Sequence, residues 1–192
     1  MRARPMIAIV TTILASVLIL AGIAFADSHE GEKTVMTDQM EMPFGGEEDV
    51  AFADALWAAM DGYGEWVMQS DIIPGKSPHG MFVRMYYNLV TIDEVAYHVV
   101  IKDNYGGKDV TLDMVKESPG SYLMAVTPMV QREAGYDDEN NNWFYVKYDA
   151  PGSISLNDMG MAMAGRVAKG MPIGCIACHA NAADGDYLFS ND

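Results

Sequence analysis

Five short segments between residues 81 and 148 have the composition of β-strands. They read MFVRMYYN (81–88), YHVVIKD (97–103), DVTLDMVK (109–116), SYLMAVTPMVQ (121–131) and NWFYVKY (142–148). Several of them alternate between apolar and polar residues, all are rich in β-branched or aromatic residues, and Gly, Pro, Asn or Asp bounds them. Five strands within about 70 residues predict an antiparallel sheet.

Two further segments have apolar residues at helical spacing. The first is DVAFADALWAAMDGY (49–63), which begins with an Asp that can cap a helix, and the second is SLNDMGMAMAGRVAK (155–169), which is followed by Gly170 and Pro172. These two helices beside the five strands predict an α+β fold, mainly antiparallel β-sheet with flanking helices. A bundle of four long helices fits this pattern less well.

The first 26 residues have the pattern of a secretory signal. Arg2 and Arg4 form a basic start, residues 6–25 are almost entirely apolar, and Ala24-Phe25-Ala26 is a small-x-small cleavage site. Cleavage after Ala26 predicts a periplasmic protein of about 166 residues with no membrane segment. The alternative is an uncleaved anchor, because about 20 apolar residues can span a bilayer. After the signal we expect an acidic flexible leader at 27–48 and a single domain at 49–192.

Acidic residues dominate the exported part of the chain. The full chain carries a formal net charge of −15, and removing the signal, with its two arginines and no acidic residue, takes it to −17. No basic patch remains that could bind phosphates, so nucleic acid is excluded as a partner.

The only two cysteines lie near the C-terminus, in Cys175-Ile176-Ala177-Cys178-His179. A disulfide across this short loop would stabilise little, a zinc site would need a second ligand pair, and a thioredoxin-like pair would need a βαβ context. In contrast, C-x-x-C-H is the attachment motif of c-type haem. We therefore predict one covalently bound haem c, with thioether bonds to Cys175 and Cys178 and with His179 as the proximal iron ligand.

Four blocks of the sequence, in this order, resemble the cytochrome P-460 family, which includes the cytochromes c′-β. The blocks are SPHGMFVRMYYN (77–88), VVIKDNY (99–105), NWFYVKY (142–148) and GCIACH (174–179), the last of which is followed by DGDYLF. The resemblance implies a β-rich, usually dimeric fold with one five-coordinate haem that is open on its distal side. It also implies chemistry on small nitrogen species, either hydroxylamine oxidation or nitric oxide binding.

The two branches of this family differ in a lysine that is bonded to a porphyrin meso carbon. The run Val99-Val100-Ile101-Lys102-Asp103 has the shape of that lysine pattern, so the resemblance implies that Lys102 is the cross-linked residue. Two alternatives stay open. Lys102 is an ordinary solvated residue at a strand end, or a second registration matches Asp113 and leaves no lysine at this point.

Three further residues are candidates for the distal side of the haem. Arg84 matches the strand arginine of the family and would place a fixed cation in the pocket, unless it faces solvent. His79 would be a proton donor or a sixth iron ligand, unless it only holds its loop in place. Glu133 would supply a carboxylate, although an ungapped count puts Gln131 at the family's position, which puts a hydroxylamine-oxidising proton acceptor in doubt.

Three functions follow from this pattern. The first is a redox enzyme acting on hydroxylamine or nitric oxide, and the second is a nitric-oxide-binding or gas-binding protein without turnover. The third is an electron-transfer cytochrome in which Met or His occupies the sixth coordination position of the iron. The expected partners are a small nitrogen-containing ligand, a periplasmic electron-transfer partner and a second copy of the chain in a homodimer.

Overall fold

The computed structural model describes residues 43–150, 152–183 and 185–189. The predicted signal at 1–26 and the leader up to residue 42 lie outside the described residues. In the described part, no helix combines the length and the apolar composition that crossing a membrane requires.

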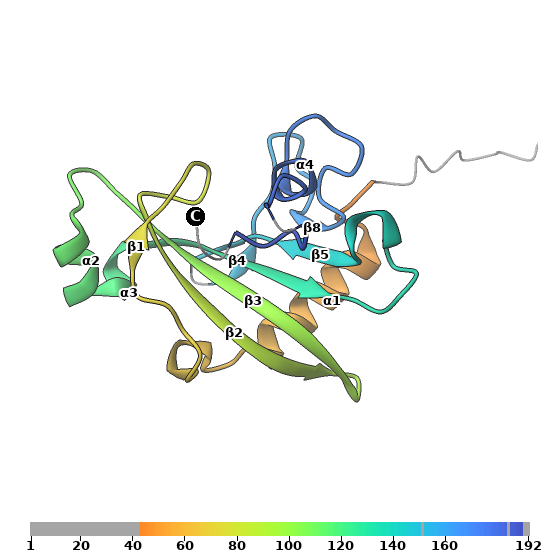
Figure 1. The fold of residues 1–192 in the computed structure, drawn as a ribbon, viewed down its shortest axis with the longest axis horizontal. Coiled ribbons are helices and arrows are strands. Elements are labelled where there is room, and N and C mark those ends of the chain that lie inside the picture. Colours follow the sequence, from red (N-terminus) through yellow and green to blue (C-terminus); the bar gives the residue numbers. More distant parts are fainter. Residues whose placement is uncertain (1–42, 151, 184, 190–192) are drawn as a thin grey trace, which may run out of the picture. The chain divides into compact units, whose positions relative to one another are not determined.

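An antiparallel sheet forms the centre of the described structure (Figure 1). Its strands lie in the order β1 (Ile73–Pro74), β2 (Phe82–Ile92), β3 (Val95–Tyr105), β4 (Leu123–Gln131), β5 (Trp143–Val146) and β8 (Ala164–Gly165). Two short strands extend it, because β6 (Tyr148–Asp149) pairs with β4 and β7 (Ser153–Ile154) pairs with β6. The predicted α+β class with a mainly antiparallel sheet is therefore confirmed.

The longest pairing is the β2–β3 hairpin, in which all 11 residues of each strand pair, from Phe82 with Tyr105 to Ile92 with Val95. Its two-residue turn, Asp93 and Glu94, has both φ angles in the left-handed region, at 48° and 67°. Such turns match the twist of the paired strands. The hairpin fixes the register that decides which residues of β3 face the functional site.

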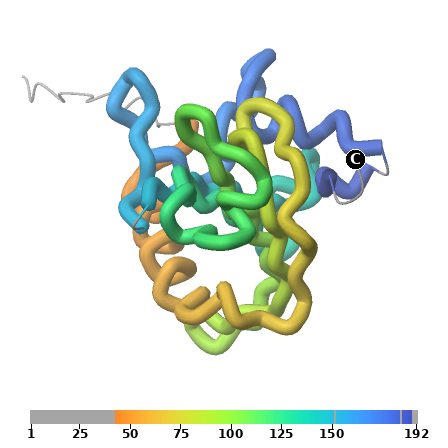
Figure 2. Tube along the Cα trace, turned by 90° about the vertical axis from the view of Figure 1, so that its left-hand side faces the viewer, coloured from red at the N-terminus to blue at the C-terminus, as the bar shows by residue number. Residues whose placement is uncertain are grey.

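Helix α1 (Glu47–Ala59) covers one face of the sheet (Figure 1). Its buried side chains Ala53 and Leu56 pack in one hydrophobic cluster with Tyr86 of β2, Ile101 of β3 and Val126 of β4. Side chains alternate between the two faces of a strand, so the residues next to these in sequence point to the opposite face. In Figure 2 the segment that contains α1 (orange) and the C-terminal segment (blue) lie on different sides of the molecule.

The N-terminal boundary of the folded part lies earlier than the sequence predicts. Helix α1 begins at Glu47 rather than Asp49, and Phe44 is buried at 3% exposure. The backbone N–H of Gly45 donates to the carbonyl of Ala164 on β8 and to the carboxylate of Asp49. Residues 44–48, which we expected in the flexible leader, thus belong to the domain.

The predicted strand at 109–116 is wrong. Helices α2 (Leu112–Glu117) and α3 (Pro119–Tyr122) occupy this region. The side-chain oxygen of Thr111 accepts a hydrogen bond from the backbone N–H of Met114, which is the geometry of an N-cap. Leu112 and Val115 are three residues apart, and on a helix this spacing turns both toward the hydrophobic cluster at this end of the sheet.

The predicted helix at 155–169 is also wrong. The chain forms a turn closed by a bridge between Leu156 and Ala162, and then enters β8. Asn157 holds the turn, because its side-chain oxygen accepts hydrogen bonds from the N–H groups of Met159 and Met161. Gly165 has φ +99°, and a Cβ there would lie 2.3 Å from the Asp49 carboxylate, so this position requires glycine and cannot be helical.

Candidate functional site

The C-x-x-C-H motif forms a one-turn helix, α4 (Cys175–His179), as its spacing predicts. Both thiols are free. Residues three apart on a helix lie on neighbouring positions of one face, which brings Cys175 and Cys178 toward the same side. Burial raises the pKa of the Cys175 thiol to about 11.

The imidazole of His179 is buried and oriented. Its side chain is 6% exposed, and its Nδ1 lies 2.7 Å from the backbone carbonyl oxygen of Tyr187. A carbonyl can only accept, so Nδ1 carries the proton and Nε2 keeps a free lone pair. Burial also lowers the pKa of His179, which favours the neutral ring. A histidine that donates from one nitrogen to a carbonyl is the usual form of a metal-binding histidine.

A cavity of about 920 Å³ lies between α4 and the face of the sheet that α1 does not cover. Its walls come from Met85 of β2, Lys102 of β3, Thr127 and Met129 of β4 and Tyr145 of β5, together with α4 and the C-terminal Leu188 and Phe189. This size is at the upper end of the range for small-molecule and cofactor sites. The cavity shares a side of the sheet with the predicted haem-attachment residues.

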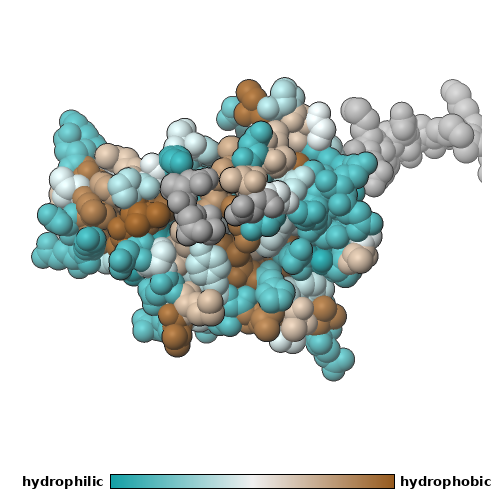
Figure 3. Space-filling model, in the orientation of Figure 1, coloured by the Kyte–Doolittle hydropathy of each residue, from teal (hydrophilic) through white to brown (hydrophobic). Residues whose placement is uncertain are grey.

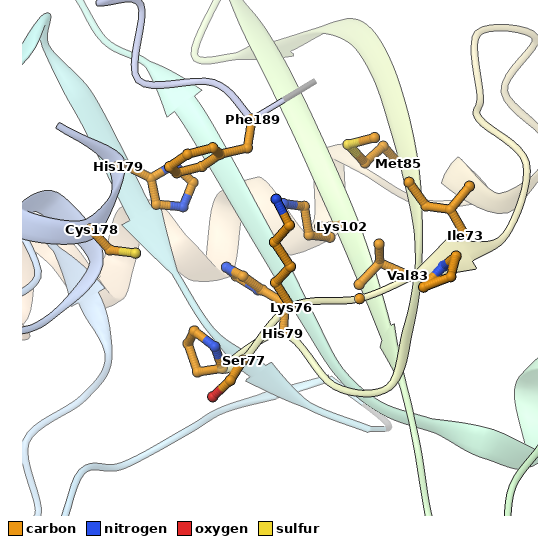
Figure 4. A pocket seen from close by; sticks show the side chains of 13 residues that line it. Ile73, Lys76, Ser77, His79, Val83, Met85, Lys102, Cys178, His179 and Phe189 are labelled. Carbon is orange, nitrogen blue, oxygen red and sulfur yellow. The ribbon is translucent and has the colours of Figure 1, made fainter. Parts of the chain in front are cut away.

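A smaller hollow of about 150 Å³ shares part of this lining. Figure 4 shows the side chains of His79, Lys102, Cys178, His179 and Phe189 around the same space. They come from a loop, a central strand, α4 and the C-terminal segment. Residues up to 110 positions apart in the sequence thus meet at one point.

Lys102 lies in the cavity, where the resemblance implies it. On β3 it pairs with Met85 of β2 and Thr127 of β4, and all three residues line the same space. Burial lowers the pKa of its amine, with an opposing contribution from Cys178. The amine in turn lowers the pKa values of His79 and His179. A buried lysine with a lowered pKa has a larger fraction of neutral, nucleophilic amine than a lysine in solvent has.

His79 also reaches the cavity. Its ring centre lies 6.0 Å from that of His179, and the two ring planes are nearly perpendicular, at 89°. Its Nδ1 lies 3.0 Å from the side-chain oxygen of Asn104. Burial and the charge of Lys102 lower the pKa of His79 to about 4, so the ring is neutral near pH 7.

The expectation that Arg84 enters the cavity is wrong. Arg84 pairs with Asp103, whereas the cavity residues Met85 and Lys102 pair with each other, so Arg84 points to the opposite face. There its charge acts on Asp103, a carboxylate that is 5% exposed. Three tyrosine hydroxyls donate to that carboxylate, from Tyr63 at 2.7 Å, Tyr105 at 2.9 Å and Tyr86 at 3.2 Å.

Replacing Asp103 by Ala is expected to lower the free energy of unfolding by about 3–5 kcal/mol, because it leaves three phenol hydroxyls without their acceptor and removes the negative charge on which Arg84 acts. Urea unfolding followed by tryptophan fluorescence measures this change. Asp71→Ala, at an exposed position, is the control and should change stability by less than about 0.5 kcal/mol. A loss of less than 1 kcal/mol for Asp103→Ala would mean that the carboxylate does not organise this cluster.

Glu133 is not part of the cavity, which corrects the prediction of a distal carboxylate there. Strand β4 ends at Gln131, so Glu133 does not continue its alternation. The side chain of Glu133 is 55% exposed and forms an ion pair with Arg132 at 2.9 Å. This hydrogen bond lowers the pKa of the Glu133 carboxyl.

Several residues around the two histidines were not among the site residues predicted from the sequence, although Tyr145 was expected in the sheet core or the haem wall. Tyr145 and Phe189 place their rings 5.5 Å and 5.4 Å from the ring of His179. Asn104 and Tyr187 orient the two histidines. Asn104 follows Lys102 by two residues on one strand, and this period-two spacing was a signal that it faces the cavity. No local signal indicates the contact of Tyr187 with His179.

The residues present fit a covalently bound haem. The donor set is one imidazole with a free nitrogen and two thiols on one helical turn, beside a large and mainly apolar cavity. Tyr145 lines the cavity, and its hydroxyl is buried without a hydrogen-bond partner in the described part of the chain. Within the described ranges, no group of three or more His, Cys, Asp and Glu side chains is arranged to hold a metal ion by itself.

No family model, no curated protein and no solved structure matches the chain. Fold and site together define an α+β protein with a large cavity on one face of an antiparallel sheet.

The outer surface is mainly hydrophilic at both ends of the face that Figure 3 shows, with hydrophobic side chains between them.

Proposed function

We propose that this chain is an exported c-type haem protein that acts in the periplasm as a redox enzyme on small nitrogen species, hydroxylamine or nitric oxide. The observation that carries the proposal is the placement of Cys175, Cys178 and His179 on one helical turn beside a cavity of about 920 Å³. The orientation of His179 supports it, because the free lone pair on Nε2 is the form that binds iron.

When bound, the haem would supply an iron atom for electron transfer and for the binding of a small ligand. The chain supplies the surroundings. The two thiols would hold the haem covalently, and the hydrogen bond from His179 to the Tyr187 carbonyl would hold the imidazole that binds the iron in one tautomer. Met85, Met129 and Phe189 line the walls with apolar groups.

The placement of Lys102 supports membership in the cytochrome P-460 family. It lines the same hollow as Cys178 and His179, and burial lowers the pKa of its amine, which favours the neutral form. A bond between this amine and a meso carbon would replace one N–H and one C–H bond and release two protons and two electrons, which an oxidant of the peroxide class would have to accept. The neutral amine has the lone pair that this bond needs. We therefore include the lysine–haem bond in the proposal, with Lys102 as the residue concerned.

A second candidate function is nitric oxide or gas binding without turnover, as in the cytochromes c′-β. The position of Glu133 favours it. Its carboxylate is exposed and paired with Arg132, so it does not reach the cavity where it would accept protons from a substrate. In both functions the distal side of the iron is open.

The absorption spectrum of the purified ferric protein tests the open site. We expect a high-spin spectrum, together with formation of a nitric oxide adduct by the ferrous protein, because the resemblance to the cytochrome P-460 family implies a five-coordinate haem that is open on its distal side. A c-type cytochrome whose iron has His and Met as its two axial ligands serves as the low-spin reference. A low-spin spectrum with a methionine charge-transfer band would reject an open site and favour electron transfer.

A further inference from the structure

His79 has a fixed tautomer, and this follows from hydrogen bonds alone. The side-chain nitrogen of Asn104 donates to the backbone carbonyls of Lys102 and Ala125, at 2.9 and 3.1 Å, and to the hydroxyl of Thr127 at 3.0 Å. Two of these partners are carbonyls, which only accept, so the orientation of the Asn104 amide is determined. Its oxygen therefore faces Nδ1 of His79, and Nδ1 must carry the proton.

The loop that carries His79 is attached firmly to the sheet. The N–H of Met81 donates to the carbonyl of Tyr105 at 2.9 Å, and the N–H of His79 donates to the carbonyl of Lys76 at 2.8 Å. Gly80 has φ +83°, and a Cβ there would lie 2.7 Å from the Tyr105 carbonyl oxygen. The loop thus holds the imidazole in one place against β3.

With Nδ1 committed to Asn104, the other ring nitrogen of His79 is an acceptor. The ring lies 6.0 Å from that of His179, and both line the cavity. His79, Cys178 and His179 line the same hollow (Figure 4), so the acceptor nitrogen of His79 belongs to the space in which an iron held by His179 would bind a small molecule.

We propose that Nε2 of His79 accepts a hydrogen bond from the ligand at the iron and so makes the site prefer ligands that carry an N–H or O–H group over diatomic gases, which carry none. This inference rests on the proposed haem function and names the residue that sets the ligand class. His79 thus supplies the acceptor that Glu133 cannot, because that carboxylate lies outside the cavity. Hydroxylamine is a ligand of the favoured class, and carbon monoxide is one of the disfavoured class.

Two substitutions separate this role from that of holding the loop. His79→Asn retains a polar atom near the position of Nδ1, so it preserves the bond to Asn104 but removes the atom at Nε2. His79→Gln places an amide near the Nε2 position and should restore part of the preference. His98→Asn changes an exposed histidine of β3 and is the matched control.

The test measures the dissociation constant of hydroxylamine for the ferric protein without an electron acceptor, and that of carbon monoxide for the ferrous protein. In His79→Asn we expect hydroxylamine binding to weaken about five- to tenfold and carbon monoxide binding to change less than twofold. His79→Gln should lie between that variant and the wild type, and His98→Asn should match the wild type.

The C–O stretching frequency of the carbon monoxide adduct gives a second readout that does not depend on affinity. A lone pair that faces the bound molecule opposes the flow of electron density onto it, so the frequency should fall when His79 is replaced by Asn. Equal weakening for both ligands, or an unchanged frequency, would overturn the role of His79. A low-spin wild type that becomes high-spin in His79→Asn would also overturn it, because Nε2 would then bind the iron itself. Protein without covalent haem would instead overturn the proposed function.

Discussion

Replacing both Cys175 and Cys178 by alanine is expected to abolish covalent haem attachment completely. Each thiol would supply one thioether bond, so the double variant has no covalent link to the porphyrin. Haem that enters the cavity of this variant is held only by His179 and by apolar contacts, and acidified acetone should extract all of it. The absorbance of the extract, compared with that of the precipitated protein, measures the fraction extracted.

Single variants are the control for this experiment. Cys175→Ala and Cys178→Ala each retain one thiol on α4, so each should keep haem in the precipitate through a single bond. His179→Ala keeps both thiols and should keep the haem while losing the axial imidazole. Extraction of haem from the wild-type protein would show that the two cysteines do not bind it.

Replacing Lys102 by alanine is the second change with a large expected effect. In the wild-type protein, the proposed bond between the Lys102 amine and the porphyrin should shift the ferrous Soret band well to the red of that of an ordinary c-type haem. Lys102→Ala should restore the ordinary band and abolish hydroxylamine oxidation, with Cys175 and Cys178 still attached. The physical reason is the position of the amine at the cavity wall, where burial lowers its pKa and favours the neutral form, whose lone pair a bond to the ring would use.

Two measurements complete this test. Lys108→Ala, at an exposed loop position after β3, is the matched control and should leave the ferrous spectrum unchanged. Tryptic digestion of the wild type should give a Lys102 peptide that carries the haem mass. A wild-type protein with an ordinary ferrous band and a free Lys102 peptide would contradict the cross-link and favour the gas-binding function.

The sequence predicted the central sheet because its strands keep a period of two along their length. In β2 and β3 the side chains of one face pack against α1 and those of the other face line the cavity, which is the arrangement that alternation indicates. Segment 109–116 was misread because its apolar residues fit both periods: 110, 112 and 114 are spaced by two as in a strand, and 112 and 115 are spaced by three as in a helix. In 155–169, three methionines alternate with a period of two, and Asn157 and Gly165 favour turns over a helix.

Sequence could predict the parts of the site that are local in the chain. Cys175, Cys178 and His179 belong to one motif, and a single turn of helix brings them together. The face on which Arg84 lies depends on strand register, and apolar neighbours on both sides gave no indication of it. The prediction that Glu133 supplies a carboxylate to the cavity was wrong because β4 ends two residues before it. The partners of the two histidines, Asn104 and Tyr187, are set by tertiary contacts.

The intact mass of the denatured wild-type protein, purified from a host that exports it and attaches haem, tests the central claim most directly. Denaturation removes every noncovalent contact, so only a haem bonded to the chain contributes to the mass. The proposal predicts the mass of the polypeptide plus one haem for each chain, and no population of the bare polypeptide. The mass of the polypeptide alone, from protein that showed haem absorbance before denaturation, would contradict it.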